Sequence, residues 1–100
     1  SGRVSFVLGL HGPCISYDTA CSAALVANHA AMRAIQAGEC AFGLATCVNL
    51  MLLPGVSWSF AAAGMTSASG RCHTFDELAD GYVRSEGCCS LVLAEESSPQ

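Results

Sequence analysis

The sequence DTACSAALVANHAAMRAIQAG occupies residues 18–38 and indicates a helix with a marked start and end. Asp18 and Thr19 carry the side-chain oxygens that are typical just before a helix begins. The run from Ala20 to Ala37 is rich in good helix formers, and Gly38 is a residue type that commonly follows a helix C-terminus. These features predict a helix over residues 20–37.

The polar side chains of this predicted helix share one stripe. At about 100° per residue their spacing places them within a narrow arc, and they are Ser22, His29, Arg33 and Gln36. Apart from Asn28, the other positions are apolar. We therefore expect the helix to be mostly buried.

Short apolar segments alternate with turns on both sides of this helix. The predicted elements are a helix or strand over residues 3–10 closed by Gly9 and Gly12-Pro13, a brief strand over 15–17, a strand over 40–49, a short helix after Pro54, a long polar loop over 66–87 and a buried strand over 88–94. The strand over 40–49 is nearly continuous in apolar residues, which is typical of a strand covered on both faces, as in a parallel sheet. This order of elements predicts α/β layers. One long helix cannot cover both faces of such a sheet, so the architecture is expected to be incomplete.

Composition restricts the class of protein. Of the 100 residues, 52% are hydrophobic and 12% are charged, which excludes a disordered tail and a coiled coil and leaves room for one small domain. The net charge of −4 argues against nucleic acid and anionic membranes as partners. No apolar stretch is long enough to predict a membrane span. The basic residues are all arginines, which excludes Schiff-base lysine chemistry and a P-loop lysine.

The cysteine count indicates the cellular compartment of the protein, and the ends of the chain indicate a fragment. Seven cysteines without a secretory signal indicate free thiols in an intracellular, reducing compartment, with the cytoplasm favoured over an organelle. The chain lacks an initiator methionine, and residues 95–100 read as the entrance to another element. We expect a fragment of a longer protein.

Cys21 is the candidate nucleophile. It stands at a strand-to-helix junction, where unpaired amide hydrogens and the positive end of the helix dipole favour a thiolate and can stabilise an oxyanion. Its small alanine and serine neighbours leave room for an acyl group. We expect Cys21 to be the most reactive thiol of the assembled protein, although its position alone also fits an inert cysteine at a buried helix start.

The other cysteines do not follow the pattern of a metal site. Zinc sites use tight Cys-x2-Cys pairs, and the cysteines of this chain are scattered or, at positions 88 and 89, adjacent. We expect no metal. We interpret five of them as small buried hydrophobic residues, namely Cys14, Cys40, Cys47, Cys88 and Cys89.

None of the three histidines is a convincing base for Cys21. His29 lies eight residues along the same helix, about 12 Å away at a rise of 1.5 Å per residue. His11 and His73 lie in predicted loops, where a solvated or locally bonded side chain is expected. The acidic residues of the long loop are expected to form a solvated face, and they are Asp76, Glu77, Asp80 and Glu86.

DTACS at residues 18–22 resembles the active-site segment of β-ketoacyl synthases, specifically the ketosynthase domain of modular type I polyketide synthases. Further segments resemble the family pattern in the same order, namely SGRVSF (1–6), GLHGP (9–13), AGEC (37–40), VNLML (48–52), AGM (63–65), GRCHTFD (70–76) and ADGYVRSEG (79–87). The sequence departs from that pattern at Ala23-Ala24, Thr46-Cys47, Ala68-Ser69 and Ser85, where serines, two glycines, Pro-Asp and a glycine are usual or frequent.

The resemblance implies a partial thiolase-like fold with α-β-α-β-α layers, in which residues 1–100 form part of one ketosynthase domain and run from its N-terminal half towards the second half. Cys21 would accept an acyl chain from the phosphopantetheine thioester of an acyl carrier protein. A malonyl-type extender would then lose carbon dioxide and attack the acyl-Cys21 thioester. The histidines and lysine that assist this chemistry in the family lie downstream of this chain, so the chain alone is expected to be inactive and to bind no cofactor.

The resemblance also implies a homodimer. In the family the strand before the nucleophile pairs with its twin across a two-fold axis, which would place residues 12–17 at the interface. Two other functions remain open from the sequence: the condensing component of a fatty acid synthase, and a non-catalytic scaffold with the ketosynthase fold.

Overall fold

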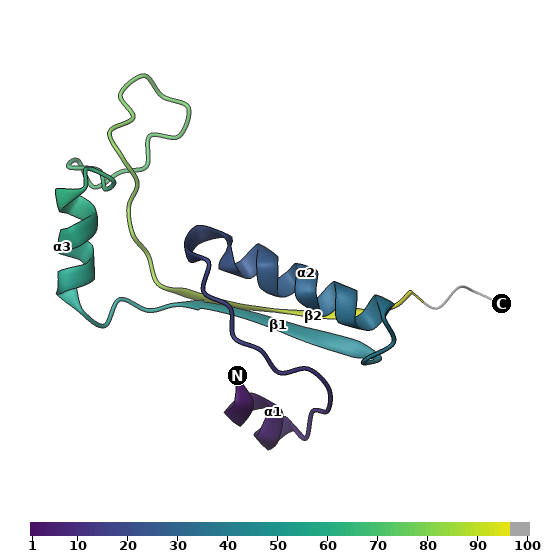
Figure 1. The fold of residues 1–100 in the computed structure, drawn as a ribbon. Coiled ribbons are helices and arrows are strands. Elements are labelled where there is room, and N and C mark those ends of the chain that lie inside the picture. The colour runs from purple at the N-terminus through teal and green to yellow at the C-terminus, as the bar shows by residue number, and fades with distance from the viewer. Residues whose placement is uncertain (97–100) are drawn as a thin grey trace. The chain divides into compact units, whose positions relative to one another are not determined.

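The computed structural model describes residues 1–96 (Figure 1). Of residues 95–100, which the sequence indicates as the entrance to another element, residues 97–100 lie outside the described residues. In chain order the elements are α1 (Gly2–Leu8), the 3₁₀ turn η1 (Ala20–Ser22), α2 (Ala23–Gln36), β1 (Phe42–Asn49), α3 (Pro54–Ala62) and β2 (Gly87–Ala94). The chain divides into two compact units. The sheet unit comprises Ser1–Cys47 with the chain from Cys88 onward, and the loop unit comprises Val48–Gly87.

The predicted long helix is confirmed. It begins with the single turn η1 and continues as α2, because the Asp18 carboxylate accepts a hydrogen bond from the Ala20 amide at 3.3 Å just before the first turn. It ends where Gly38 takes a left-handed φ of 73° and donates its amide to the Ile35 carbonyl at 2.9 Å. A glycine at this position adopts that conformation without a steric penalty.

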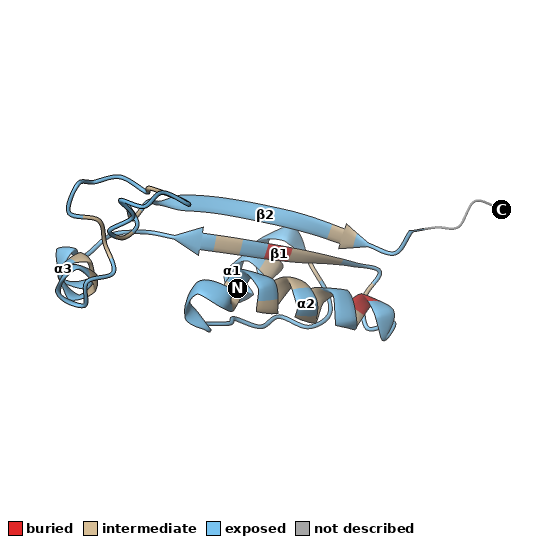
Figure 2. Ribbon diagram, turned by 90° about the horizontal axis from the view of Figure 1, so that it is seen from above, coloured by how far each residue is buried: buried red, intermediate tan, exposed pale blue. Residues whose placement is uncertain are grey.

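The core of the sheet unit lies between α2 and β1. The buried side chains among the described residues are Ile35 of α2 and Ala45 of β1, which are 9% and 4% exposed (Figure 2). At Gly43 an added Cβ would lie 3.1 Å from the Ala31 Cβ and 3.5 Å from the Ile35 Cδ1. Glycine therefore allows the helix to approach the strand closely.

The prediction that the long helix and the strand over residues 88–94 are buried was wrong. Leu25 of α2 is 73% exposed and Val92 of β2 is 72% exposed. The described residues contain one sheet of two strands, β1 and β2, and the arrows in Figure 2 run in opposite directions, so the pair is antiparallel and not parallel. The hydroxyls of Thr46 and Ser90 meet across it at 2.8 Å. Within the sheet unit α2 covers one face of β1, and residues 1–96 supply too few elements to cover the remaining apolar surface.

The predicted strand over residues 15–17 is absent. A strand is defined by hydrogen bonds to a neighbouring strand, and β1 and β2 pair with each other. Ile15 is 59% exposed in a segment without regular secondary structure. The segment over residues 3–10, which the sequence left open between helix and strand, is a helix, α1, closed by Gly9 at a φ of 62°.

The loop unit contains the short helix and the long loop that the sequence predicted. Pro54 occupies the first turn of α3, where its missing amide hydrogen is no loss. The loop that follows is closed by an isolated bridge between Thr66 and Tyr82. A Cβ added at Gly81, whose φ is 142°, would lie 2.5 Å from the Thr66 carbonyl carbon, so only glycine fits beside the bridge.

The two ends of the loop unit are also tied together. The Asn49 side-chain amide donates to the Ser85 carbonyl, and the Met51 amide donates to the Glu86 carboxylate at 2.7 Å. These bonds join segments more than thirty residues apart in the sequence. None of the helices within residues 1–96 has the length and apolar character that crossing a membrane requires.

The exposed apolar surface leads to a first prediction. Purified as the 100-residue chain alone, the protein should aggregate or lack a sharp unfolding transition, because most of its large apolar side chains are exposed rather than buried. Denaturant unfolding followed by circular dichroism, with size-exclusion chromatography, measures this. A monomer that unfolds in one steep transition would contradict it.

Candidate active site around Cys21

Cys21 lies in the tight turn that leads into α2. It is the middle residue of η1, its side chain is exposed, and α2 begins two residues later. The amides of the first helical turn have no helical partner and carry the positive end of the helix dipole. The structure therefore places the thiol where the sequence predicted it, at a helix start.

Ala20, directly before the candidate nucleophile, has a left-handed backbone. Its φ is 55°, and this conformation costs a residue other than glycine of the order of 1–3 kcal/mol. Strained residues of this kind concentrate at functional sites. The sequence carries no signal for it, because alanine is not a residue that favours positive φ.

Hydrogen bonds on both sides hold this turn. The Asp18 carboxylate accepts from the Ala20 amide, and the Ser22 hydroxyl lies 2.9 Å from the Thr19 carbonyl and 2.8 Å from the Thr19 hydroxyl. Asp18, Thr19 and Ser22 thus fix the backbone on either side of Cys21. A preorganised turn of this kind keeps the thiol and the helix amides in a constant relation.

The histidines do not assemble around Cys21. No side chain among residues 1–96 is hydrogen-bonded to the Cys21 sulfur. His11 and His29 are exposed within the same unit, and His73 belongs to the loop unit, where its Nε2 lies 3.3 Å from the Ser69 hydroxyl. The expectation of a locally bonded His73 is confirmed. The described residues hold the candidate nucleophile at a helix start without a histidine bonded to it.

The interpretation of five cysteines as buried hydrophobes was wrong. Of these, Cys40 and Cys47 are half-buried, and Cys14, Cys88 and Cys89 are exposed. The reason is the missing cover over the sheet unit described above. Cys72, in the loop unit, is exposed as well. Within the described chain, no three side chains of the metal-binding types come together in a group that could hold an ion.

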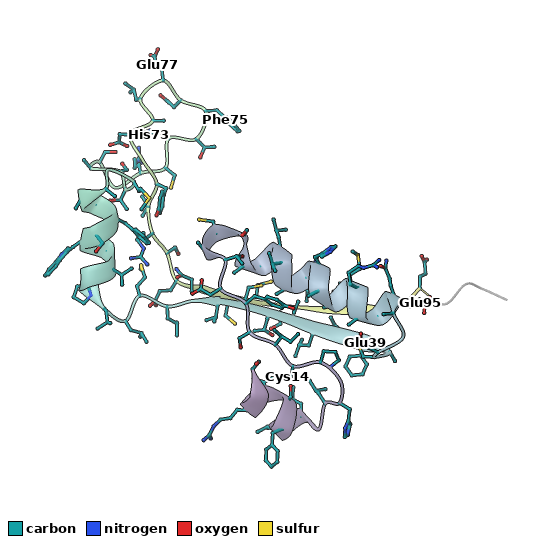
Figure 3. All side chains as sticks on the ribbon, in the orientation of Figure 1. Cys14, Glu39, His73, Phe75, Glu77 and Glu95 are labelled. Atoms are coloured by element: carbon teal, nitrogen blue, oxygen red, sulfur yellow. The ribbon has the colours of Figure 1, made fainter. Side chains whose placement is uncertain are left out.

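Cys14 has a polarised environment that the sequence did not reveal. The Ser5 hydroxyl donates a hydrogen bond to the Cys14 sulfur at 3.2 Å, which joins α1 to the segment before the Cys21 turn (Figure 3). This bond, together with one from Ser1, holds the pKa of the Cys14 thiol below its usual value. Cys14 therefore joins Cys21 as a candidate reactive thiol of the sheet unit.

The acidic residues of the long loop are exposed, as predicted. Three of them accept hydrogen bonds from backbone amides: Asp76 from Leu78 at 2.8 Å, Asp80 from Ser69 at 3.4 Å and Glu86 from Met51 at 2.7 Å. A hydrogen bond from the Ser67 side chain holds the pKa of the Asp80 carboxyl below its usual value.

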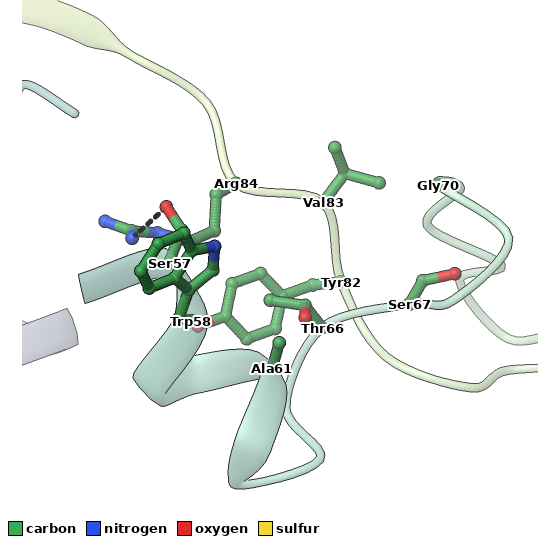
Figure 4. A pocket seen from close by; sticks show the side chains of 9 residues that line it. All are labelled: Ser57, Trp58, Ala61, Thr66, Ser67, Gly70, Tyr82, Val83 and Arg84. Atoms are coloured by element: carbon green, nitrogen blue, oxygen red, sulfur yellow. Dashed lines mark hydrogen bonds between the residues drawn. The ribbon is translucent and has the colours of Figure 1, made fainter. Parts of the chain in front are cut away.

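The loop unit also contains a shallow pocket of about 320 Å³ beside Arg84 (Figure 4). The Arg84 guanidinium donates to the Ser57 hydroxyl at 3.0 Å and lies 4.7 Å from the centre of the Phe60 ring. Trp58 and Tyr82 form apolar walls. Sequence reasoning missed this cluster, because its members are spread over residues 57–84 without a recognisable spacing.

Known proteins match nearly the whole chain. Residues 1–98 match the family model described as Beta-ketoacyl synthase, N-terminal domain. The chain is 48% identical over 93 residues to a mycocerosic acid synthase-like polyketide synthase of Mycolicibacterium smegmatis and 52% identical over 93 residues to one of Mycobacterium tuberculosis. These matches cover 93% of the chain and only 4% of each relative.

Solved structures agree with these relatives. The oxazolomycin ketosynthase domain of Streptomyces albus JA3453 superposes with a TM-score of 0.90 at 40% identity, over 94% of this chain and 17% of that one. The ketosynthase from module 6 of the bacillaene synthase of Bacillus subtilis 168 gives a TM-score of 0.90 at 41% identity, with the same coverage. The partial thiolase-like α/β fold is thereby confirmed.

The Ser5 hydrogen bond gives a prediction for thiol reactivity. In the full-length protein, Ser5→Ala should slow alkylation of Cys14 several-fold near neutral pH, because loss of the donor raises the pKa of that thiol and leaves less thiolate. Timed iodoacetamide labelling with peptide mass spectrometry measures each cysteine separately. Labelling of Cys21 should be unchanged, and Ser90→Ala, which removes a hydroxyl that is bonded to Thr46 and not to Cys14, serves as the control. An unchanged Cys14 rate in Ser5→Ala would count against this account.

Proposed function

Because the chain belongs to the β-ketoacyl synthase family, we propose that residues 1–100 form the nucleophile-bearing part of one ketosynthase domain of a polyketide synthase. The observation that carries this proposal is the exposed Cys21 in a strained, hydrogen-bonded turn at the start of α2. The relatives named above are polyketide synthases, which favours this context over the condensing component of a fatty acid synthase.

Acyl transfer is the first proposed step. The Cys21 thiolate attacks the carbonyl carbon of an acyl thioester carried on the phosphopantetheine of an acyl carrier protein. A bond forms between the Cys21 sulfur and that carbon, the oxyanion is stabilised by helix amides, and the phosphopantetheine thiolate leaves. The exposed thiol supports this step, because an acyl carrier must bring its arm to an accessible sulfur.

Condensation is the second proposed step. A malonyl-type thioester loses carbon dioxide, and the resulting carbanion attacks the carbonyl carbon of acyl-Cys21. A carbon–carbon bond forms, and the Cys21 thiolate is released. The groups that assist decarboxylation are proposed to come from another part of the protein, since no histidine within residues 1–96 is bonded to Cys21. The 100-residue chain by itself is therefore proposed not to condense.

Replacement of Cys21 tests the assignment. In the full-length protein, Cys21→Ala should reduce acyl loading by several orders of magnitude, because the sulfur that accepts the acyl group is gone. Intact-protein mass spectrometry after incubation with an acyl thioester measures the adduct. Cys14→Ala removes the other polarised thiol and should load normally. Loading of Cys21→Ala at the wild-type rate would refute the proposal.

We also propose that the protein is a homodimer. Residues 12–17 are exposed, have no regular secondary structure and are without a strand partner among the described residues, and they lead directly into the Cys21 turn. An unpaired segment of this kind can pair with its twin in a second copy. The active-site turn would then be braced by the partner.

Light scattering tests this assembly. The full-length protein should have twice the protomer mass, and Ser16→Pro should shift it towards the monomer, because proline removes an amide hydrogen needed for pairing. Circular dichroism of the variant checks that it remains folded. A wild-type monomer with full activity would exclude the dimer.

A further inference from the structure

Strands β1 and β2 pair with matched ends. Each has eight residues, and the two run in opposite directions (Figure 2). The hydroxyls of Thr46 and Ser90 lie 2.8 Å apart. These two residues are therefore directly opposite each other, because diagonal neighbours in an antiparallel pair lie about 7–8 Å apart. Thr46 is the fifth residue from the start of β1 and Ser90 is the fifth from the end of β2, so the strand ends agree with the same register.

This register brings two cysteines opposite each other. One step forward along β1 and one step back along β2 lead from Thr46 and Ser90 to Cys47 and Cys89. Directly opposite residues present their side chains on the same face, with Cα atoms about 4.5 or 5.5 Å apart according to their place in the ladder. A disulfide spans Cα separations of about 4.4–6.8 Å. Both thiols are free in the structure, and the register places them within disulfide reach.

The pair lies on the face of the sheet that α2 covers. Side chains alternate along a strand, so Cys47 shares its face with Gly43 and Ala45. A Cβ added at Gly43 would lie 3.1 Å from the Ala31 Cβ of α2, and Ala45 is buried. Cys47 is accordingly half-buried, whereas Cys89 is exposed. A reagent in solution therefore reaches Cys89 first.

We propose that Cys47 and Cys89 form a cross-strand dithiol that a small disulfide, such as oxidised glutathione, converts reversibly into a covalent bond between β1 and β2. The Cys89 thiolate attacks one sulfur of the small disulfide, a mixed disulfide forms, and one small thiolate leaves. The Cys47 thiolate then attacks the Cys89 sulfur, the protein disulfide forms, and the second small thiolate leaves. The two thiol protons end on the two small thiols, and two electrons pass from the protein to the small disulfide. The pairing follows from the sheet and is independent of the catalytic role proposed for Cys21.

The bond is expected to be easily reduced. Opposite residues of an antiparallel pair have Cβ atoms about 4.5–5.5 Å apart, whereas a disulfide has a mean Cβ separation of about 3.8 Å. Closing the bond must therefore draw the strands together. A strained disulfide has a more oxidising potential than a relaxed one, which is typical of labile, regulatory disulfides rather than structural ones.

The dithiol distinguishes this chain from the pattern that it resembles. Position 47 is one of the departures from that pattern, and a glycine is frequent there. A chain with glycine at position 47 has no thiol opposite Cys89 and cannot form the bond. The pair is therefore a feature of this sequence and not a requirement of the fold.

Oxidation would close the loop unit covalently. Val48–Gly87 lies wholly between the two cysteines along the chain. A cross-link that closes a long loop restricts the unfolded chain more than one that closes a short loop. We expect the amides of β1 and β2 to exchange hydrogen at least about tenfold more slowly in the oxidised protein than in the reduced protein.

Peptide mapping of the full-length protein tests the bond. The protein is incubated with oxidised glutathione, its remaining thiols are blocked with N-ethylmaleimide, and it is then denatured and digested with trypsin without a reductant. Cleavage after arginine places Cys47 in the peptide 34–71 and Cys89 in the peptide that begins at Ser85. We expect these peptides to be linked through Cys47 and Cys89, as assigned by fragmentation, and to separate with dithiothreitol. Absence of the link, or its assignment to Cys88, would overturn the proposal.

Cys88 is the matched control. It is adjacent to Cys89 and also exposed, but it lies opposite Val48, on the other face of the sheet. The link and the slower amide exchange should both persist in Cys88→Ser and disappear in Cys47→Ser and in Cys89→Ser. A link that survives in Cys89→Ser, or that is lost in Cys88→Ser, would reject the cross-strand pair.

Non-reducing gel electrophoresis separates a bond within one chain from a bond between two copies. The oxidised protein should migrate at the mass of the protomer. A covalent dimer that disappears in Cys89→Ser would place the bond between chains and would also overturn the proposal.

Discussion

The close approach of α2 to β1 is the contact on which the sheet unit depends. Gly43 lets the strand lie against Ala31, and Ile35 and Ala45 are buried beside this contact. A side chain at position 43 would have to push the helix away from the strand. Since η1 and Cys21 continue directly from the N-terminus of α2, the same contact positions the candidate nucleophile.

The local elements were predictable because their signals are local. The helix start at Asp18, the end at Gly38 and the helix after Pro54 each depend on residues within one turn of the boundary. Burial was not predictable in the same way. An apolar strand indicates that something covers it, but not which segment does, and the described chain covers only one face of β1.

In the candidate site, too, the local feature could be predicted from the sequence and the other features could not. The position of Cys21 followed from its sequence motif, and the structure agrees. The left-handed Ala20 and the Ser5 bond to Cys14 did not follow, because the first has no residue preference behind it and the second joins residues nine positions apart without a periodic pattern. The Ser69 hydroxyl and the His73 Nε2, which lie 3.3 Å apart, likewise meet only in the folded loop.

The ties at the ends of the loop unit bear on how such a domain can change during evolution. Hydrogen bonds between Asn49 and Ser85, and between Met51 and Glu86, join the start and the end of the loop unit. The entropy of closing a loop grows only slowly with its length, so residues can be inserted or deleted between these ties at little cost to stability. The loop unit can therefore vary in length and sequence among relatives while β1 and β2 keep their pairing.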